Sequence, residues 1–342
     1  MKNGKLSNEQ LMDLVISRLP QLSANTLVGA SIGADCAWLK VGDCLMVTSS
    51  DPITAGGKNS GTLAIHVSCN DIAACGVRPS GILIVIIAPS DSSEKEISDI
   101  VDQASREAAK LGVDIVGGHT EISDAVNRFI VISTAFGIIG KDHPVPAGRA
   151  RAGDKLVLTK TCGIEGSYIL SHEHIEKLKG KMSGDLLEEA RHYDSLISVV
   201  DEGEITGNLA KASGEANAEG FKLCKADLMH DVTEGGVLGA AYEMAHFSDL
   251  GITVDERAIP MTDATREICS ILNIDPYRLI SSGSLLIATA EPDAVIEALN
   301  AKNIKATVIG EFTDKNEGYK SININGYVTK MEPPSADELY KI

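Results

Sequence analysis

The sequence predicts an α+β protein built from two α/β domains. Its 342 residues suffice for two domains that each bury a core. Strand-like apolar runs alternate with amphipathic helical segments along the chain. The stretch 141–154 holds two prolines, two glycines and two arginines but few apolar residues, as is typical of a linker. We therefore expect an N-terminal domain at 1–150, a C-terminal domain at 151–316, and a terminal hairpin and tail at 317–342.

Local signals define the start of the first half. Ser7 and Gln10 have the spacing of a capping box, and a helical apolar pattern follows up to Pro20. Two apolar runs then flank Gly42-Asp43, which predicts a hairpin with a two-residue turn. Its strands are expected at 36–41 and 44–50.

The next two elements carry the most informative polar residues. A helix is expected at 59–75, after the Gly56-Gly57 break, with Asn70 and Asp71 in its last turns. The continuous apolar run 82–88 predicts a strand buried on both faces.

One more helix and two strands complete the first half. Ser93 and Glu96 are spaced to cap a helix. A short strand at 113–116 is expected to end in the loop Gly117-Gly118-His119-Thr120-Glu121, and a long strand follows at 129–139.

The second half continues the alternation. A strand at 226–229 leads into His230-Asp231-Val232-Thr233-Glu234-Gly235-Gly236 and then a helix through Met244. Asn325-Gly326 predicts the turn of a terminal hairpin. Further strands are expected at 155–160, 251–254, 285–289, 319–324 and 327–331.

Composition and charge exclude several kinds of partner. A formal net charge of -17 repels phosphate backbones and anionic lipid surfaces, so no nucleic acid or membrane partner is expected. The seven cysteines are odd in number, scattered and without a Cys-x-x-Cys pair, which indicates reduced thiols. The N-terminus has no signal-peptide core, and the longest apolar run is too short to span a bilayer. A cytoplasmic location is the expectation.

Acidic residues at element ends suggest a metal site. Asp35, Asp51, Asp71 and Glu121 each lie beside glycine or small residues where a strand or helix ends. Magnesium prefers oxygen ligands and can join carboxylates to a triphosphate, which lets an acidic protein bind ATP. Each acid alone is more commonly a solvated turn residue.

Several candidate residues have two interpretations. Asp71, in an apolar segment, is either a ligand or a helix-end acid bonded to backbone amides. The Gly117 to Thr120 segment lacks phosphate-loop spacing, and His119 is either an acid–base group or a structural one. Asp231 offers a carboxylate to a metal or caps the following helix.

Together these segments resemble the aminoimidazole ribonucleotide synthase-like (PurM-like) superfamily, over about the whole chain. That group includes the hydrogenase maturation protein HypE, thiamine monophosphate kinase and selenophosphate synthetase, and the layout is most similar to HypE. The stretches that carry the resemblance are Gly33-Ala34-Asp35-Cys36-Ala37, Thr48-Ser49-Ser50-Asp51, the run from Asn70-Asp71-Ile72-Ala73-Ala74 to Pro79, Gly117-Gly118-His119-Thr120-Glu121 and the motif from His230 to Gly236.

The resemblance implies a fold and a chemistry. It implies an N-terminal ATP-binding domain whose strands form a β-barrel shared across a homodimer, and a C-terminal α/β sandwich domain. The implied reaction is ATP- and Mg²⁺-dependent phosphorylation of a small substrate or a carboxamide-type oxygen.

The implied site residues fall into three overlapping sets. The catalytic residues are expected to be Asp71, His119 and Asp231. Nucleotide contacts are expected from Asp35, Asp51, Asn70, Asp71, Gly117, Gly118, His119 and Thr120. The metal ligands are expected to be Asp35, Asp51, Asp71 and Asp231.

Departures from the family keep other functions open. Members often have two adjacent acids where this chain has Ala34-Asp35, and kinase-like members have an acid at the position of His119. The terminal cysteine of HypE has no counterpart after Glu338, and the first cysteine, Cys36, lies too late for selenophosphate synthetase. The alternatives are a non-catalytic nucleotide-binding partner in enzyme maturation, a small-molecule kinase resembling thiamine monophosphate kinase, and a metal-binding scaffold without nucleotide.

Overall fold

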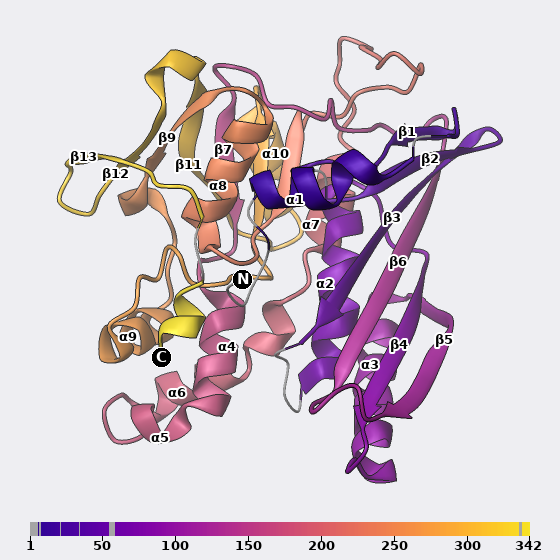
Figure 1. Cartoon of the computed structure of the whole chain (residues 1–342). Coiled ribbons are helices and arrows are strands. Elements are labelled where there is room, and N and C mark those ends of the chain that lie inside the picture. Colours follow the sequence, from indigo (N-terminus) through magenta and orange to yellow (C-terminus); the bar gives the residue numbers. More distant parts are fainter. Residues whose placement is uncertain (1–5, 7, 21, 34, 55–58, 335–336) are drawn as a thin grey trace.

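Two β-sheets with packed helices organise the chain (Figure 1). The computed structural model describes residues 6, 8–20, 22–33, 35–54, 59–334 and 337–342. The predicted capping residue Ser7, the motif residue Ala34 and the Gly56-Gly57 break lie outside these residues. The predicted α+β class is confirmed, and the first sheet is open within one chain.

The first sheet has six strands in the order β1-β2-β3-β6-β4-β5. Its strands are β1 (Thr26–Val28), β2 (Ala37–Val41), β3 (Cys44–Ile53), β4 (Gly81–Pro89), β5 (Asp114–Ser123) and β6 (Ile130–Gly140). The predicted hairpin is confirmed, since Val41 pairs with Cys44 around Gly42, whose φ of 60° suits glycine. Only β4 and β5 run parallel among these pairs.

Helices cover one face of this sheet. α2 (Ser60–Ala74) packs against β3 and β6, and α3 (Glu94–Leu111) packs beside α2. The predicted capping box of Ser93 and Glu96 is present at the start of α3. The first predicted helix is shorter than expected, as α1 (Asn8–Leu14).

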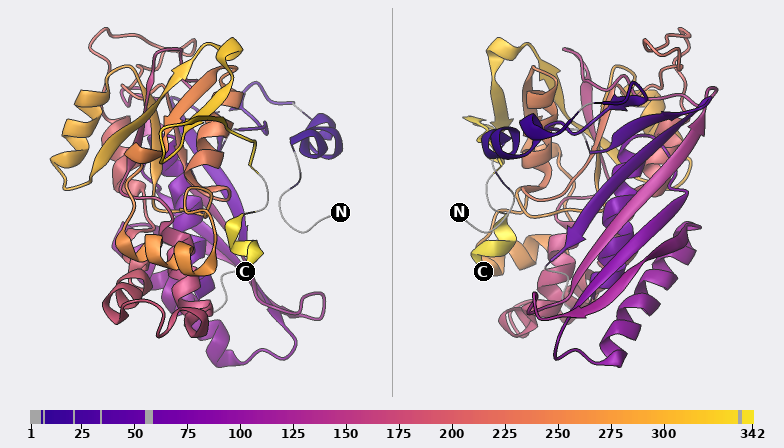
Figure 2. Two further views of the ribbon diagram at one scale, coloured as in Figure 1. Left: turned by 90° about the vertical axis from the view of Figure 1, so that its left-hand side faces the viewer. Right: turned by 45° about the vertical axis from the view of Figure 1, so that its right-hand side comes forward.

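The other face of the first sheet carries no helix of the described chain (Figure 2). Leu83 of β4 is 40% exposed and Ile138 of β6 is 53% exposed on this outer face. The prediction that 82–88 is buried on both faces is therefore wrong. Its inner residues Ile82, Ile84 and Ile86 are buried, because α2 and α3 cover that side alone.

The strand β5 also corrects the sequence prediction. It runs from Asp114 to Ser123, so Gly117 to Glu121 form an edge strand and not a loop. Gly118 has a physical role here: a Cβ would lie 1.7 Å from the carbonyl oxygen of Ile84 on β4. The absence of a side chain at Gly118 permits close pairing of β5 with β4. From sequence alone, a glycine needed for this reason looks the same as a glycine in a turn.

The second sheet has seven strands in the order β13-β12-β9-β11-β7-β10-β8. Its strands are β7 (Lys155–Thr159), β8 (Leu228–Asp231), β9 (Gly251–Asp255), β10 (Leu285–Thr289), β11 (Ala306–Thr313), β12 (Tyr319–Ile322) and β13 (Val328–Lys330). The predicted terminal hairpin is confirmed as β12 and β13, and β12 runs parallel to β9. The helices are α4 (Ile164–Glu173), α5 (Ile175–Leu178), α6 (Gly184–Arg191), α7 (Val200–Gly207), α8 (Gly236–Phe247), α9 (Asp263–Leu272) and α10 (Pro292–Asn300).

The two sheets share a core at their seam. α8 packs on one face of the second sheet, while buried residues of the other face continue into the core around α2. α7 packs tightly on α2: a Cβ on Gly203 would lie 2.1 Å from the carbonyl oxygen of Ala73. Glycine at this position therefore sets how closely the two halves approach.

Candidate active site

Four carboxylates from separate segments converge at the seam between the sheets. Asp35 lies just before β2, Asp51 near the end of β3, and Asp71 in the last turns of α2. Asp231 is the last residue of β8 in the second sheet. The structure thus brings together the four residues that the sequence predicted as metal ligands.

Ser49 joins two of these carboxylates. The strand alternation of β3 places Ser49 and Asp51 on the face toward α2, with buried Val47 two residues earlier. The hydroxyl of Ser49 donates a hydrogen bond of 2.5 Å to Oδ2 of Asp71, and its Oγ lies 3.4 Å from Oδ2 of Asp51.

The carboxylates of this cluster lie close enough to repel one another when they are ionised. Burial raises the pKa of Asp71 well above its ordinary value, and the charges of Asp231, Asp51 and Asp35 raise it further. Carboxylates placed this closely repel one another unless a proton or a cation lies among them. The cluster is therefore suited to holding positive charge.

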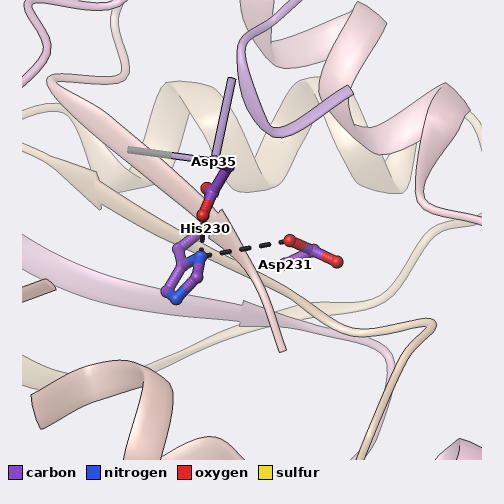
Figure 3. Close-up of side chains that lie close together, drawn as sticks. All are labelled: Asp35, His230 and Asp231. Atoms are coloured by element: carbon purple, nitrogen blue, oxygen red, sulfur yellow. Dashed lines mark hydrogen bonds and ion pairs between the residues drawn. The ribbon is translucent and has the colours of Figure 1, made fainter. Parts of the chain in front are cut away.

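His230 lies between two of the carboxylates (Figure 3). Its Nδ1 is 3.1 Å from Oδ2 of Asp35 and 3.9 Å from Oδ1 of Asp231. Its Nε2 is 3.3 Å from Oε2 of Glu243 on α8. Burial by itself lowers the pKa of His230, but the charge and hydrogen bond of Asp35 and the contact with Glu243 outweigh it, so the pKa is raised well above the usual value.

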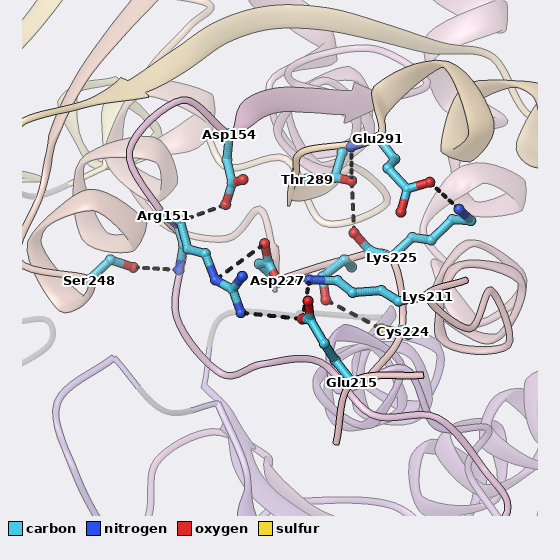
Figure 4. A network of polar contacts seen from close by, with 12 residues as sticks. Arg151, Asp154, Lys211, Glu215, Cys224, Lys225, Asp227, Ser248, Thr289 and Glu291 are labelled. Atoms are coloured by element: carbon cyan, nitrogen blue, oxygen red, sulfur yellow. Dashed lines mark hydrogen bonds and ion pairs between the residues drawn. The ribbon is translucent and has the colours of Figure 1, made fainter. Parts of the chain in front are cut away.

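A polar network anchors the strand that carries His230 and Asp231 (Figure 4). Asp227, directly before β8, is fully buried and accepts a hydrogen bond of 2.6 Å from Nζ of Lys211. Nε of Arg151 lies 3.9 Å from the same carboxyl group. The backbone NH of Arg151 donates to Asp154, whose pKa burial raises to about 6.

Asn70 faces away from the carboxylates. It is fully buried, and its side-chain amide donates to the carbonyl of Ile197 at 2.8 Å. Its carbonyl accepts from the backbone NH of Val199, also at 2.8 Å. The amide that the sequence predicted as a nucleotide contact therefore binds the backbone of the second half.

The remaining predicted residues lie on β5. Gly117, Gly118, His119 and Thr120 are exposed on this edge strand. In the sheet order, β6 and β4 separate β5 from β3, a distance of about 14 Å at three strand spacings. Nε2 of His119 is 3.1 Å from Oε2 of Glu121. Within one chain, these residues are not part of the carboxylate cluster.

Three residues of the cluster were not predicted as site residues. Ser49 could have been found from the alternation of β3, which gives it the same face as Asp51. His230 stood in the quoted motif but was not assigned a role. Its pairing with Asp35 joins positions 195 residues apart, and Glu243 joins through helix packing, so neither contact has a local sequence signal.

Two mixed sheets with carboxylates of both halves at their seam define a two-domain class of α/β protein. The chain belongs to the AIR synthase related protein family: the family's N-terminal domain matches residues 33–139 and its C-terminal domain matches residues 151–322. The resemblance inferred from the motifs is confirmed.

Hydrogenase maturation proteins are among the similar proteins. A putative hydrogenase expression/formation protein of Methanocaldococcus jannaschii is 26% identical over 325 residues, covering 92% of this chain and 90% of the relative. Carbamoyl dehydratase HypE of Escherichia coli is 26% identical over 298 residues, covering 85% and 81%. A solved HypE in complex with ATP matches with a TM-score of 0.69 at 21% identity, covering 98% of this chain and 97% of that one, and so shares the fold.

No helix in the described part of the chain combines the length and apolar character needed to cross a membrane.

Proposed function

We propose that this chain is an ATP- and Mg²⁺-dependent enzyme that phosphorylates a small substrate or a carboxamide-type oxygen. One observation carries the proposal: Asp35, Asp51 and Asp71 of the first half meet Asp231 of the second half in one cluster. Such a seam between two domains is a common place for a nucleotide and its acceptor to meet.

The donor chemistry of the cluster fits magnesium. Asp35, Asp51, Asp71 and Asp231 offer carboxylate oxygens, which are the ligands that Mg²⁺ prefers alongside phosphate oxygens. When bound, Mg²⁺ would neutralise phosphate charge and orient the phosphoryl group. Burial and the neighbouring charges of Asp231, Asp51 and Asp35 raise the pKa of Asp71, and a cation among these carboxylates would offset their mutual repulsion.

The residues of the chain have distinct parts in this proposal. Asp71 of the first half and Asp231 of the second half bind Mg²⁺ and through it fix the nucleotide between the two halves. Ser49 holds Asp71 in one orientation through its short hydrogen bond. His230 contacts Asp35 and Asp231 through its Nδ1, at 3.1 Å and 3.9 Å, and so links the carboxylates of the two halves.

The relatives support the same class of reaction. The Escherichia coli relative is named a carbamoyl dehydratase, and a HypE protein of this fold was solved with ATP. Those properties belong to those proteins. Their shared family and fold make an ATP-activated, carbamoyl-type substrate the first chemistry to test on this chain.

Nucleotide binding is tested by thermal unfolding with ATP and Mg²⁺. A ligand at a hundred times its dissociation constant adds about 2.7 kcal/mol to the free energy of unfolding. We expect this stabilisation in the wild-type chain and its loss in Asp71→Asn, while the exposed Asp185→Asn retains it. A wild-type chain that ATP and Mg²⁺ do not stabilise would overturn the proposal.

Turnover separates the alternatives. ADP or AMP release that depends on a carbamoyl compound supports the proposed reaction, and release that depends on a phosphorylated alcohol supports a small-molecule kinase. Nucleotide binding without turnover, together with a co-purifying protein, supports a non-catalytic maturation partner. Stabilisation by Mg²⁺ alone supports a metal-binding scaffold.

A further inference from the structure

His230 gives the carboxylate cluster a nitrogen donor. One ligand atom each from Asp35, His230 and Asp231 lies within 4.8 Å of the other two. Nδ1 of His230 faces both carboxylates, at 3.1 Å from Asp35 and 3.9 Å from Asp231 (Figure 3). A divalent ion about 2.0–2.2 Å from each donor holds neighbouring donors about 3.0–3.5 Å apart, so small side-chain shifts would complete the contacts.

The other ring nitrogen has the partner that a metal-bound histidine needs. Nε2 of His230 lies 3.3 Å from Oε2 of Glu243. A histidine that binds a metal through one nitrogen almost always donates its other N–H to a carboxylate or carbonyl, which fixes the ring and its tautomer. Glu243 on α8 is placed to accept that hydrogen bond and leave Nδ1 directed at Asp35 and Asp231.

A small cavity adjoins Asp35, His230 and Glu243. Its volume is about 10 Å³, and its lining includes Gly33, Asp35, His230, Glu243 and Met244. This volume is about that of one water-sized sphere. The cavity therefore has room for a single ion or water next to Asp35 and His230, and not for a larger ligand; Asp231 lies outside its lining.

We propose that Asp35, His230 and Asp231 bind a first-row transition-metal dication, such as Co²⁺, Zn²⁺ or Mn²⁺, in preference to Mg²⁺. Imidazole nitrogen suits these ions, whereas Mg²⁺ favours oxygen donors alone. This ion would take the place given above to Mg²⁺ at Asp35 and Asp231, and Asp51 and Asp71 would remain for Mg²⁺. Its role beside ATP rests on the function proposed above. The binding of the ion rests on the three donors and is measured without nucleotide.

The test is a titration of the full chain with Co²⁺ and, separately, with Mg²⁺, followed by calorimetry and by the visible absorption of bound Co²⁺. We expect Co²⁺ to bind at least ten times more tightly than Mg²⁺. His230→Asn should weaken Co²⁺ binding at least tenfold and change Mg²⁺ binding less than threefold. His192→Asn is the matched control, because His192 is exposed near Glu188 and represents adventitious surface binding.

Two outcomes overturn the proposal. One is equal Co²⁺ affinity in wild type and His230→Asn; the other is loss of Co²⁺ binding in His192→Asn but not in His230→Asn. Because a variant can fail to fold, the wild-type chain is also examined with Mn²⁺ by pulsed electron paramagnetic resonance. Coupling to a directly bound imidazole nitrogen supports the site, and its absence from bound Mn²⁺ contradicts it.

These results are independent of nucleotide binding. Co²⁺ binding through His230 without any stabilisation by ATP would leave the metal site standing and refute the proposed function. Stabilisation by ATP and Mg²⁺ without a nitrogen-bound ion would support the proposed function and refute the metal site.

Discussion

At the residue scale, two neighbouring side chains on α2, those of Asn70 and Asp71, have different partners. Asp71 faces the carboxylate cluster, whereas Asn70 uses both ends of its amide to bind the backbone at Ile197 and Val199. The helix thereby fixes the position of Asp71 relative to the second half of the chain. We infer that Asn70 positions the site without touching the nucleotide.

Replacing Asn70 tests this assignment. Asn70→Ala leaves a buried carbonyl and a buried backbone NH without their hydrogen bonds, each costing about 1–3 kcal/mol. We expect the free energy of unfolding, measured with urea, to fall by about 2–4 kcal/mol. The exposed Asn325→Ala is the control, and equal stability of the two variants would contradict a clamping role.

Glu165, in the first turn of α4, makes the stability of the protein depend on pH. It is buried, and burial raises its pKa from 4.5 to about 7, while hydrogen bonds from Ser282 oppose the rise. Below pH 4.5 the group is protonated in both folded and unfolded states. As the pH rises, the unfolded chain ionises first, so this contribution to stability is lost progressively up to about pH 7.

Glu165→Gln removes that loss. Since Gln can accept the same hydrogen bonds without a charge, we expect the variant to be more stable than wild type at pH 8 by up to about 3 kcal/mol. At pH 5 the difference should be small. Urea unfolding at both pH values provides the measurement, and a difference that does not change with pH would refute the explanation.

The carboxylates could be inferred from sequence, but their complete arrangement could not. Asp35, Asp51 and Asp71 lie at element ends beside small residues, and the family motifs gave these three and Asp231 their expected roles as ligands. His230 lacked such a signal, since its neighbours come from a distant loop and from α8. Asn70 was expected to contact the nucleotide, and its adjacency to Asp71 gives no sign that its amide binds the backbone at Ile197 and Val199.

At the element scale, α7 and α2 depend on glycine for their contact. The backbone of Gly203 in α7 packs directly on the carbonyl group of Ala73, and the backbone of Gly207 packs in the same way on Gly76. Outside such contacts, alanine is favoured over glycine in a helix by about 1 kcal/mol. Here the missing side chain matters more than helix propensity.

Gly203→Ala should therefore destabilise the protein although it favours the helix. Its Cβ would lie 2.1 Å from the carbonyl oxygen of Ala73, so the two helices must separate. We expect a loss of about 1–3 kcal/mol, as for an overpacked core. Gly184→Ala, in open space at the start of α6, should be neutral or slightly stabilising in the same thermal unfolding experiment. Similar effects of the two substitutions would show that the close contact is unimportant.

Elements with local signals were predictable, and those shaped by their neighbours were not. The hairpin at Gly42 and the capped start of α3 followed from turn and capping residues. The predicted strand at 113–116 was shorter than β5, because Gly118 looks like a turn residue until its close approach to Ile84 is known. β11 was not predicted, since an irregularity between Val308 and Gly310 interrupts the two-residue alternation of a strand.

At the scale of the whole molecule, the outer face of the first sheet remains open in one chain. Leu83 and Ile138 contribute exposed apolar side chains to it. The family resemblance implied a barrel shared by two copies, and an open sheet face is what such pairing requires. We propose that two copies of this chain associate through this face.

The mass of the protein in solution tests the dimer. Light scattering after size exclusion should give twice the 36.1 kDa of one chain. The double variant Leu83→Lys, Ile138→Lys puts like charges on both sides of the interface and should give a single-chain mass. Val328→Lys, on exposed β13, should leave the dimer intact. A wild-type chain of single mass would refute the proposal.

The clamp at Asn70 also has a consequence for synthesis on the ribosome. The last strand of the first sheet ends at Gly140, yet the groups that bind Asn70 and cover α2 belong to residues 197–207. About sixty further residues must leave the exit tunnel before the first half can complete its packing. Residues up to 140, expressed alone, would keep an uncovered apolar helix face and leave the side-chain amide of Asn70 without both of its backbone partners. The nascent chain thus passes through an interval in which its exposed apolar surface makes it prone to aggregation.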